Sequence, residues 1–205
     1  METGFTTEEI KRKYDGFADK YAMMERVQEF LGVRKLRKRL LERASGEVLE
    51  VACGTGANFP YYPQECSITA VDMSPAMMAI ATQRAEELGL AVDFRSMNAQ
   101  TLEFPDESFD TVVSSLTVCT FPDPIAALSE MKRVCREDGR LLFLEHGRSN
   151  NRLVGRFQDI RAEAHAEQLG CHWNRDPLAL VEQAGLHPIA TRRTFFGVFH
   201  EIVAE

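Results

Sequence analysis

The sequence predicts an α/β fold: a seven-stranded sheet that is mostly parallel and carries helices on both faces. From Glu47 onward, short apolar runs alternate with helix-like segments, which is typical of parallel strands joined by crossover helices. The last two strands are linked by only about three residues around Phe195. So short a link permits a hairpin and no crossover, and the last strand is therefore expected to be antiparallel.

The strands are expected at residues 47–51, 67–72, 91–95, 109–114, 139–145, 187–193 and 197–203. Helices between them are expected at residues 57–62, 75–88, 123–136 and 176–184. Pro75 stands at a helix start, where proline is tolerated, and Asp123-Pro124 and Asp176-Pro177 have the same cap-then-proline form. Gly89 is expected to end the helix that Pro75 begins.

Residues before the first strand read as a helical region, 7–44, in two pieces that break near Gly32. Its basic run 34–39 is interpreted as a solvated helix face, in preference to a patch for membrane or nucleic acid. The length of 205 residues favours one domain, 1–205, with a helical cap at 1–45. An insertion at 146–175 follows the fifth strand, where ligands bind in open α/β sheets, and is well placed to cover a substrate.

The composition excludes some classes of function. A net charge of −7 argues against general affinity for nucleic acid, because phosphate binding needs a positive field. No apolar run approaches the ~20 residues of a membrane span, and the first five residues lack the parts of a signal peptide. Five cysteines, odd in number and widely spaced, favour reduced thiols in the cytoplasm, and no C-x-x-C pair indicates zinc.

The most informative stretch is 48–59, an apolar run that ends in a glycine loop. A second apolar run then stops at Asp72. This pattern predicts a nucleotide-binding half-site in which the acid accepts hydrogen bonds from ribose hydroxyls. Phe59 occupies the third glycine position of a dinucleotide loop, and Glu50 would help repel a pyrophosphate. A cationic ligand that carries no phosphate would instead be attracted by the carboxylate of Glu50.

The pattern Glu50-x-Ala52-x-Gly54-x-Gly56, followed by Asp72, resembles the loop of class I S-adenosylmethionine-dependent methyltransferases. Ala52 stands where that family usually has glycine, and alanine is tolerable there if its φ stays negative. The resemblance implies a Rossmann-like sheet with a reversed seventh strand and an N-terminal helical lid. It also implies S-adenosylmethionine as cofactor, S-adenosylhomocysteine as product, and no metal.

Further segments extend the resemblance over the chain from about residue 14 to its end, and it implies one set of cofactor-binding residues. They are Tyr14, Tyr21, Glu50, Ala52, Cys53, Gly54, Thr55, Gly56, Asn58, Asp72, Met73, Met77, Asn98, Ala99, Ser114, Ser115, Leu116 and Cys119. By this likeness Asp72 holds both ribose hydroxyls, Met73 lies against the adenine, and Asn98 accepts from its amino group where relatives use aspartate. The helix of Tyr14 and Tyr21 either covers the cofactor or docks without touching it.

Two candidate general bases follow the fifth strand, His146 first and Glu145 second. An amine or carbon acid needs such a base, whereas a thiol with a pKa near ~8.5 is already partly ionised. The alternative role of His146 is to order its loop by hydrogen bonds. Cys119 either lines the substrate pocket or is a buried core thiol.

Residues 56–63, 144–149 and 170–175 resemble a subgroup that includes thiol methyltransferases of microsomes, bacterial phosphatidylethanolamine N-methyltransferases and quinone C-methyltransferases. The expected function is methyl transfer to a small-molecule acceptor, a thiol ahead of an amine, a phospholipid headgroup or a quinol. A cofactor-binding module without catalysis is the second hypothesis. Nucleic-acid methylation is disfavoured, because residues 115–118 lack the loop that grips a flipped base. The chain is expected to be a monomer or homodimer, with peripheral membrane contact allowed.

Overall fold

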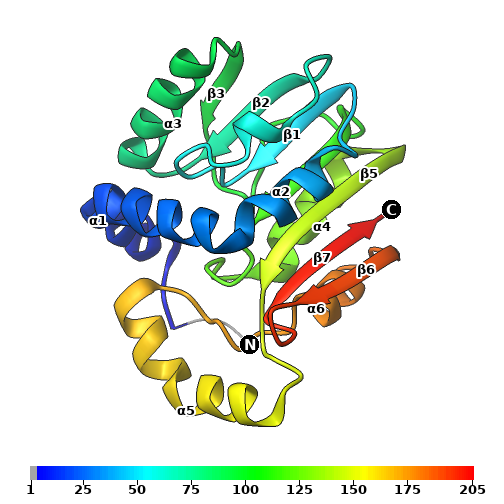
Figure 1. Ribbon diagram of the computed structural model, residues 1–205. Coiled ribbons are helices and arrows are strands. Elements are labelled where there is room, and N and C mark those ends of the chain that lie inside the picture. The colour runs from blue at the N-terminus through cyan, green and yellow to red at the C-terminus, as the bar shows by residue number, and fades with distance from the viewer. Residues whose placement is uncertain (1–3) are drawn as a thin grey trace.

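The computed structural model of the chain describes residues 4–205, and residues 1–3, the start of the predicted cap, lie outside the described residues. Its seven strands are β1 (Glu47–Val51), β2 (Ser67–Asp72), β3 (Val92–Ser96), β4 (Phe109–Ser115), β5 (Cys135–His146), β6 (Pro188–Thr194) and β7 (Phe199–Ala204). They form one sheet in the order β3-β2-β1-β4-β5-β7-β6 (Figure 1). β7 is antiparallel to β5 and β6, and the other neighbours are parallel. The predicted fold class is confirmed.

The helical elements are α1 (Thr7–Gln28), the π-helical turn η1 (Glu29–Val33), α2 (Arg34–Leu41), the 3₁₀ turn η2 (Phe59–Tyr61), α3 (Pro75–Leu88), α4 (Pro124–Val134), α5 (Arg152–Leu169) and α6 (Pro177–Gln183). Side-chain caps start α3, α4 and α6, where Ser74, Asp123 and Asp176 each accept from a backbone N–H of the first turn. A proline follows each cap, as the sequence predicts.

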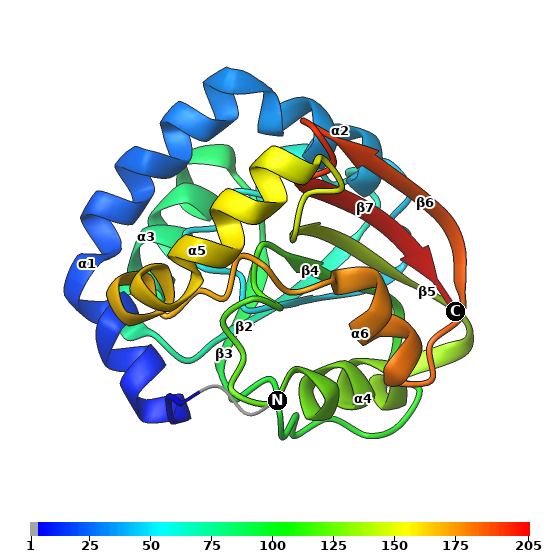
Figure 2. The same ribbon diagram turned by 90° about the horizontal axis from the view of Figure 1, so that it is seen from below.

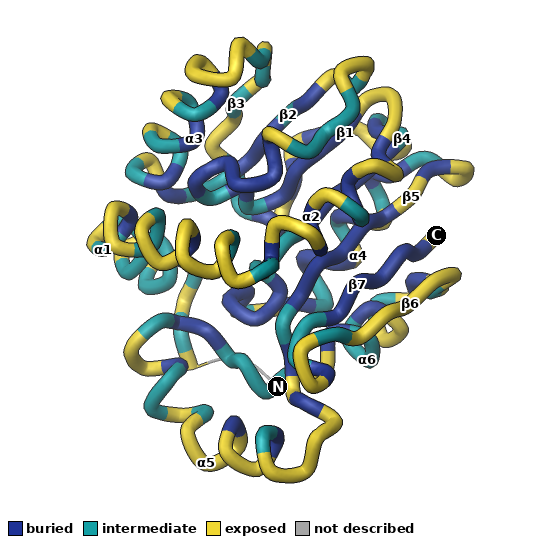
Figure 3. The backbone as a smooth tube through the Cα atoms, in the orientation of Figure 1, coloured by how far each residue is buried: buried dark blue, intermediate teal, exposed yellow. Residues whose placement is uncertain are grey.

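Helices cover both faces of the sheet because successive strand residues point to opposite sides. Leu49 packs in the core formed with α4 and α6, whereas Val48 packs in the core formed with α2. Ala70 of β2 faces α3 on the same side as Val48. Figure 3 shows the central strands as buried, and β6 at the edge as exposed. The other edge strand, β3, also has no buried residue, so the sheet has a two-sided core between two solvated edges.

The N-terminal region breaks at Gly32, as predicted, where φ is +121° and the helical conformation is interrupted. A second irregularity, at Phe17, was not predicted: its φ of −134° is not helical. The basic run that follows is only partly a solvated face. Arg37 is 3% exposed, whereas Arg34 and Lys35 point to solvent.

One predicted helix is wrong. Residues 57–62 were expected to be helical, but the structure has only the three-residue turn η2. Pro60 and Pro63 account for this, because proline lacks a backbone N–H and disfavours helical conformation in the residue before it. The bulky ring of Phe59 also packs into the core beside Phe94 of β3, which holds the turn against the sheet.

The insertion at 146–175 contains α5, which crosses below the sheet (Figure 1). Trp173 anchors it: its ring stacks on His165 at 4.1 Å, and its Nε1 donates to the carbonyl of Gln158 at 3.0 Å. The far end of α5 reaches α1, where Lys13 Nζ donates to the Glu167 carbonyl at 2.5 Å. The predicted cap and the predicted insertion therefore contact each other.

Candidate active site

An open pocket lies at the carboxyl ends of β1, β2 and β4, the position at which ligands bind in open α/β sheets. Its empty space is about 910 Å³ when the open space at its mouth is included. The loops after these strands form its floor, and Ile10, Tyr14 and Tyr21 of α1 form one wall. In the view of Figure 2, from below, α1 and α5 flank this end of the sheet. The tyrosine rings of α1 contact each other edge to face, with centroids 5.8 Å apart.

Asp72 ends β2 in the pocket wall. Its Oδ2 accepts the backbone N–H of Gly54 at 2.8 Å, and its Oδ1 accepts that of Ser74 at 2.8 Å. Burial raises the pKa of this carboxyl, and the backbone donors act in the opposite direction. Each carboxylate oxygen has two acceptor sites, so one on each oxygen is still available to a hydroxyl group.

The glycine loop between β1 and η2 leaves space beside its backbone. Gly54 has φ +55°, and a Cβ built on it would meet no atom within 4 Å, so the loop has an open cradle on the pocket side. Ala52 corrects an expectation, because its φ is +54° and not negative. Leu116, which follows β4 in the same pocket, has φ +60°. Left-handed backbone at such residues costs about 1–2 kcal/mol, and strain of this kind clusters at ligand sites.

Below the glycine loop lies a buried polar network. Glu50 is 2% exposed and accepts from Asn58 Nδ2 at 3.0 Å and from the Tyr62 hydroxyl at 2.7 Å. Arg37 donates to Asn58 Oδ1 at 2.7 Å and to Glu29 at 2.8 Å. Burial raises the pKa of Glu50 to about 7, against the opposing effect of these donors and of the Arg37 charge. The pocket thus has a carboxyl group whose charged form is disfavoured by burial.

Most predicted cofactor-binding residues line this pocket. They are Tyr14, Tyr21, Glu50, Ala52, Cys53, Gly54, Asn58, Asp72, Met73, Met77, Asn98, Ala99, Ser115 and Leu116. The sequence analysis missed others: Thr7, Ile10, Lys11, Glu25, Arg37, Ala57, Ser74, Met97, Thr117, Thr120, Phe121 and Pro122. No local motif indicated Glu25 and Arg37, because each lies on a helix that only tertiary packing brings to the strands.

Two predicted residues of the glycine loop and one of β4 do not line the pocket. Thr55 is fully buried and its hydroxyl donates to Glu25 at 2.6 Å, which ties the loop to α1. Gly56 turns away, because a Cβ on it would lie 2.5 Å from the ring of Phe59. Ser114 is also fully buried and donates to Glu145 at 2.9 Å. These residues support the pocket from behind.

Glu145, the second candidate base, also lies behind the pocket wall. Besides Ser114, it accepts the backbone N–H groups of Thr117 at 3.0 Å and Val118 at 3.2 Å. Burial raises its pKa to about 7. This geometry fixes the loop after β4, and it does not bring the carboxyl group to the pocket surface.

The first candidate base, His146, lies outside the pocket lining as well. Its Nε2 is 3.3 Å from Cys119 Sγ and 3.4 Å from Cys171 Sγ. Cys119 is 2% exposed and is likewise absent from the pocket wall. Burial lowers the pKa of His146, but Cys119 and the charge of Glu145 outweigh it, so that the pKa is raised.

The residues of this pocket fit S-adenosylmethionine. Asp72 offers free acceptor sites for two ribose hydroxyls, and Gly54 leaves room for a ligand close to the backbone. Glu25 and Asp72 supply negative charge for a sulfonium and an ammonium group, and Arg37 and Lys11 supply positive charge for a carboxylate. A cation bound in the pocket would also favour the ionised form of Glu50.

Comparison with known proteins agrees with this site. A family described as "Methyltransferase domain" matches residues 49–143. The chain is 34% identical over 206 residues to the mitochondrial methyltransferase OMS1 of Saccharomyces cerevisiae, covering 91% of this chain and 43% of that protein. It is 44% identical over 103 residues to phosphatidylethanolamine N-methyltransferase of Cereibacter sphaeroides (49% and 51% covered). It is 34% identical over 158 residues to the mouse thiol S-methyltransferase TMT1B (70% and 62% covered).

The chain thus spans between 43% and 62% of the lengths of these relatives. Among solved structures, a methyltransferase from Thermotoga maritima superposes with a TM-score of 0.70 at 21% identity, covering 94% of this chain and 98% of that one. That likeness establishes the fold. The family match and the named relatives lead to one assignment: residues 49–143 form a methyltransferase domain, and the chain is similar to methyltransferases on both sides of it.

Proposed function

We propose that this protein transfers the methyl group of S-adenosylmethionine to the sulfur of a small-molecule thiol. The bound cofactor supplies an electrophilic methyl group on a positively charged sulfur. The pocket residues bind and orient that group: Asp72 at the ribose, and the acidic side chains Glu25 and Glu50 near the positive charges. Alignment of the acceptor and exclusion of water then supply most of the acceleration.

One observation carries the choice of a thiol. The pocket wall that follows β4, next to the expected place of the methyl group, consists of Ser115, Leu116, Thr117, Thr120, Phe121 and Pro122. None of these described residues has an ionisable side chain. An amine or a carbon acid needs a base at this point, whereas a thiol is partly ionised at neutral pH without one.

The relatives support methyl transfer and leave the acceptor open, since their names cover a thiol, an amine headgroup and quinone biosynthesis. The test is to measure S-adenosylhomocysteine formation with purified protein over thiol, amine, phospholipid and quinol acceptors. We expect turnover with the thiols. Turnover with an amine or a quinol alone would contradict the proposal, and cofactor binding without turnover of any acceptor would support the alternative of a binding module.

We also propose that the protein contacts a membrane surface that contains anionic lipids. One continuous surface, called here the apolar-basic surface, exposes large apolar side chains from η1, the β6–β7 turn and α5. They are Phe30 (82% exposed), Leu31 (66%), Leu153 (81%), Phe157 (58%), Ile160 (71%) and Phe196 (76%). Its exposed basic residues are Arg34, Lys35, Arg152 and Arg156.

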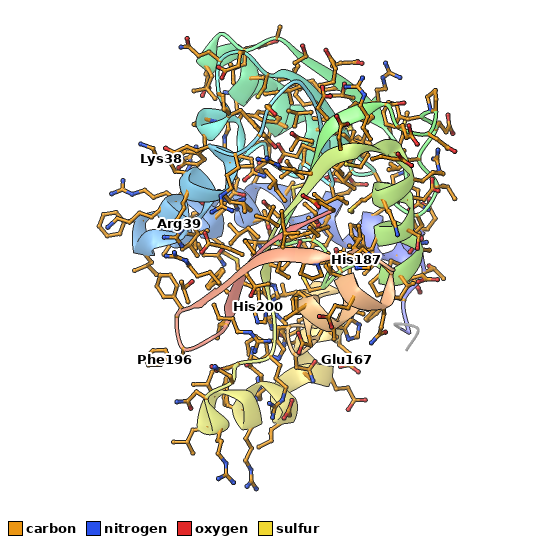
Figure 4. The ribbon with its side chains drawn as sticks, turned by 90° about the vertical axis from the view of Figure 1, so that its right-hand side faces the viewer. Lys38, Arg39, Glu167, His187, Phe196 and His200 are labelled. Atoms are coloured by element: carbon orange, nitrogen blue, oxygen red, sulfur yellow. The ribbon has the colours of Figure 1, made fainter. Side chains whose placement is uncertain are left out.

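Two contacts make this surface continuous. The ring of Phe195 lies against Gly32 of η1, and the Ser149 hydroxyl before α5 donates to the carbonyl of Phe196. Figure 2 shows the β6–β7 turn beside both η1 and the start of α5, and Figure 4 shows Phe196 at the edge of the molecule. The attraction to an anionic lipid surface comes from the local combination of exposed apolar and basic residues, and it acts against the net charge of −7 of the whole chain.

Co-sedimentation with vesicles tests this contact. We expect binding to phosphatidylglycerol vesicles that weakens with added salt and is lost in the variant Leu153→Asp/Phe157→Asp. Leu88→Asp, at an exposed leucine at the end of α3, is the matched control and should bind like the unmodified protein. Equal sedimentation of all three proteins would refute the proposed surface.

No helix among the described residues is long and apolar enough to cross a bilayer. The cytoplasmic location and the oligomeric state, monomer or homodimer, stay predictions from the sequence.

A further inference from the structure

A cluster of three metal-binding side chains lies directly behind the pocket wall. Cys119, His146 and Cys171 each offer one ligand atom, and these atoms lie within 4.8 Å of one another. The His146 Nε2 is 3.3 Å from the sulfur of Cys119 and 3.4 Å from that of Cys171. The sequence analysis expected no metal, because the chain has no C-x-x-C pair. The cluster joins residues that are distant in sequence, since 27 and 25 residues separate His146 from the two cysteines.

The backbone holds these residues in place. The N–H of His172 donates to the carbonyl of Cys119 at 2.9 Å, which joins the end of the insertion to the loop after β4. Arg175 reinforces the same junction, since its Nη1 donates to the carbonyls of Val118 at 2.5 Å and Phe121 at 3.0 Å. His146 is the last residue of β5 and pairs with Phe199 of β7. The three ligand atoms therefore sit on a preformed frame and not on free loops.

The donor set selects the metal. Zinc binds thiolate sulfur at about 2.3 Å and imidazole nitrogen at about 2.1 Å, and tetrahedral geometry then separates the ligand atoms by about 3.5–3.8 Å. The distances of 3.3 and 3.4 Å from His146 Nε2 to the two sulfurs are within a few tenths of an ångström of this spacing. Two cysteines and one histidine suit Zn²⁺, and three protein ligands leave one position open, as in catalytic zinc sites.

We propose that Cys119, His146 and Cys171 bind one Zn²⁺ ion and that its fourth position takes the sulfur of the acceptor thiol. The site adjoins the pocket, because Thr117 and Thr120, on either side of Cys119, line the pocket wall. Tyr14 lies in the facing wall.

The chemistry balances without a further reactant. Cys119 and Cys171 lose their protons to solvent when the metal binds, and the acceptor thiol loses its own proton when its sulfur takes the fourth position. A lone pair of that sulfur then forms a bond to the methyl carbon. The bond between this carbon and the sulfonium sulfur breaks, and its electron pair stays on S-adenosylhomocysteine. The acceptor part of this proposal rests on the proposed thiol methyl transfer, whereas the metal site does not.

The first experiment measures the metal directly. Reduced, full-length protein is incubated with Zn²⁺, dialysed against metal-free buffer and analysed by inductively coupled plasma mass spectrometry. We expect one zinc per chain, loss of it in Cys119→Ser and Cys171→Ser, and full retention in Cys66→Ser, a cysteine outside the cluster. Loading the unmodified protein with Co²⁺ should give a thiolate-to-metal charge-transfer band, a readout that needs no variant to fold.

The second experiment titrates thiophenol into the Co²⁺-loaded protein. A change in the visible spectrum that saturates with one thiol per metal is expected, and an unchanged spectrum would overturn the role of the fourth position. Zinc-free protein, or zinc that the double variant Cys119→Ser/Cys171→Ser retains, would overturn the site itself. Thiol methylation at the same rate without zinc would leave the proposed function intact and overturn the role of the metal. Bound zinc without methylation of any thiol would leave the metal site intact and overturn the proposed thiol methyl transfer.

Discussion

At the scale of single residues, several residues of the site have a backbone conformation or a degree of burial that is energetically unfavourable for that residue type. Ala52 and Leu116 adopt left-handed backbone, with φ of +54° and +60°, on two loops that face the same pocket. Glu50 is buried where its charged form is disfavoured. Residues in such conformations persist only when the surrounding structure holds them, and they are typical of ligand sites.

Asp72→Ala is expected to abolish measurable cofactor binding, because the carboxylate is the acceptor for the ribose hydroxyls. Loss of two charge-assisted hydrogen bonds of about 1.5–3 kcal/mol each corresponds to at least about a hundredfold lower affinity. Isothermal titration calorimetry with S-adenosylhomocysteine measures this. Asp93→Ala, at an exposed aspartate on β3, serves as control. Unchanged affinity in Asp72→Ala would refute the assigned role.

Glu50 predicts a pH dependence of stability in the ligand-free protein. Its pKa is raised from 4.5 to about 7 in the folded state, chiefly by burial. Between these two values the folded protein holds a proton that the unfolded chain releases. The contribution of Glu50 to the free energy of unfolding is therefore fully present below pH ~4.5. It is lost as the pH rises through ~7, and the total loss is about 3 kcal/mol.

The variant Glu50→Gln is expected to remove this part of the decrease in unfolding free energy with pH, because glutamine does not titrate. Glutamine also keeps hydrogen-bonding groups for Asn58 and Tyr62. Urea unfolding at pH values from 4.5 to 8 measures the free energy of unfolding for both proteins. Glu65→Gln, at an exposed position, is the control and should keep the slope of the unmodified protein. If the free energy of unfolding changes with pH in the same way for Glu50→Gln and the unmodified protein, the expectation is contradicted.

At the scale of elements, most boundaries follow from local signals. Proline after a capping residue starts α3, α4 and α6, and Gly89 in left-handed conformation ends α3. The false helix at 57–62 shows the limit of such signals. Its apolar residues serve the core through a 3₁₀ turn, because the prolines on either side prevent a longer helix.

The break between α1 and α2 gives a prediction at this scale. Gly32 has φ +121° and lies against the ring of Phe195, and a Cβ there would be 3.2 Å from that ring. We expect Gly32→Ala to lower the free energy of unfolding by about 1–3 kcal/mol, since alanine does not adopt this backbone without strain.

Gly16→Ala is the matched control on the same helical region. A Cβ on Gly16 meets no atom within 4 Å, and its φ is not positive, so alanine should be neutral or stabilising by up to about 1 kcal/mol. Thermal unfolding followed by circular dichroism compares the two variants. A melting temperature of Gly32→Ala equal to that of the unmodified protein would show that the break is not required.

At the scale of the whole molecule, the pocket joins elements that are remote in sequence: α1, the loops after β1, β2 and β4, and the segment after β3. A ligand that contacts all of them stabilises the folded state by mass action. S-adenosylhomocysteine at about 100 times its dissociation constant should add about 2.7 kcal/mol, or roughly 5–10 °C in melting temperature. Differential scanning fluorimetry measures the shift, which should be absent in Asp72→Ala at the same concentration.

The sequence alone determined the sheet, its antiparallel last strand and the glycine loop between β1 and Asp72. The signals for these features are the alternation of apolar runs, glycines, prolines and capping residues, and each of them acts within a few positions of the chain. The resemblance to class I methyltransferases predicted many of the residues that line the pocket. Tertiary structure alone decided that Arg37 enters the pocket, that Ser114 and Glu145 stand behind it, and that Cys119, His146 and Cys171 meet. Contacts of this kind join segments dozens of residues apart, and their geometry depends on how the whole sheet and its helices pack, which no local pattern records.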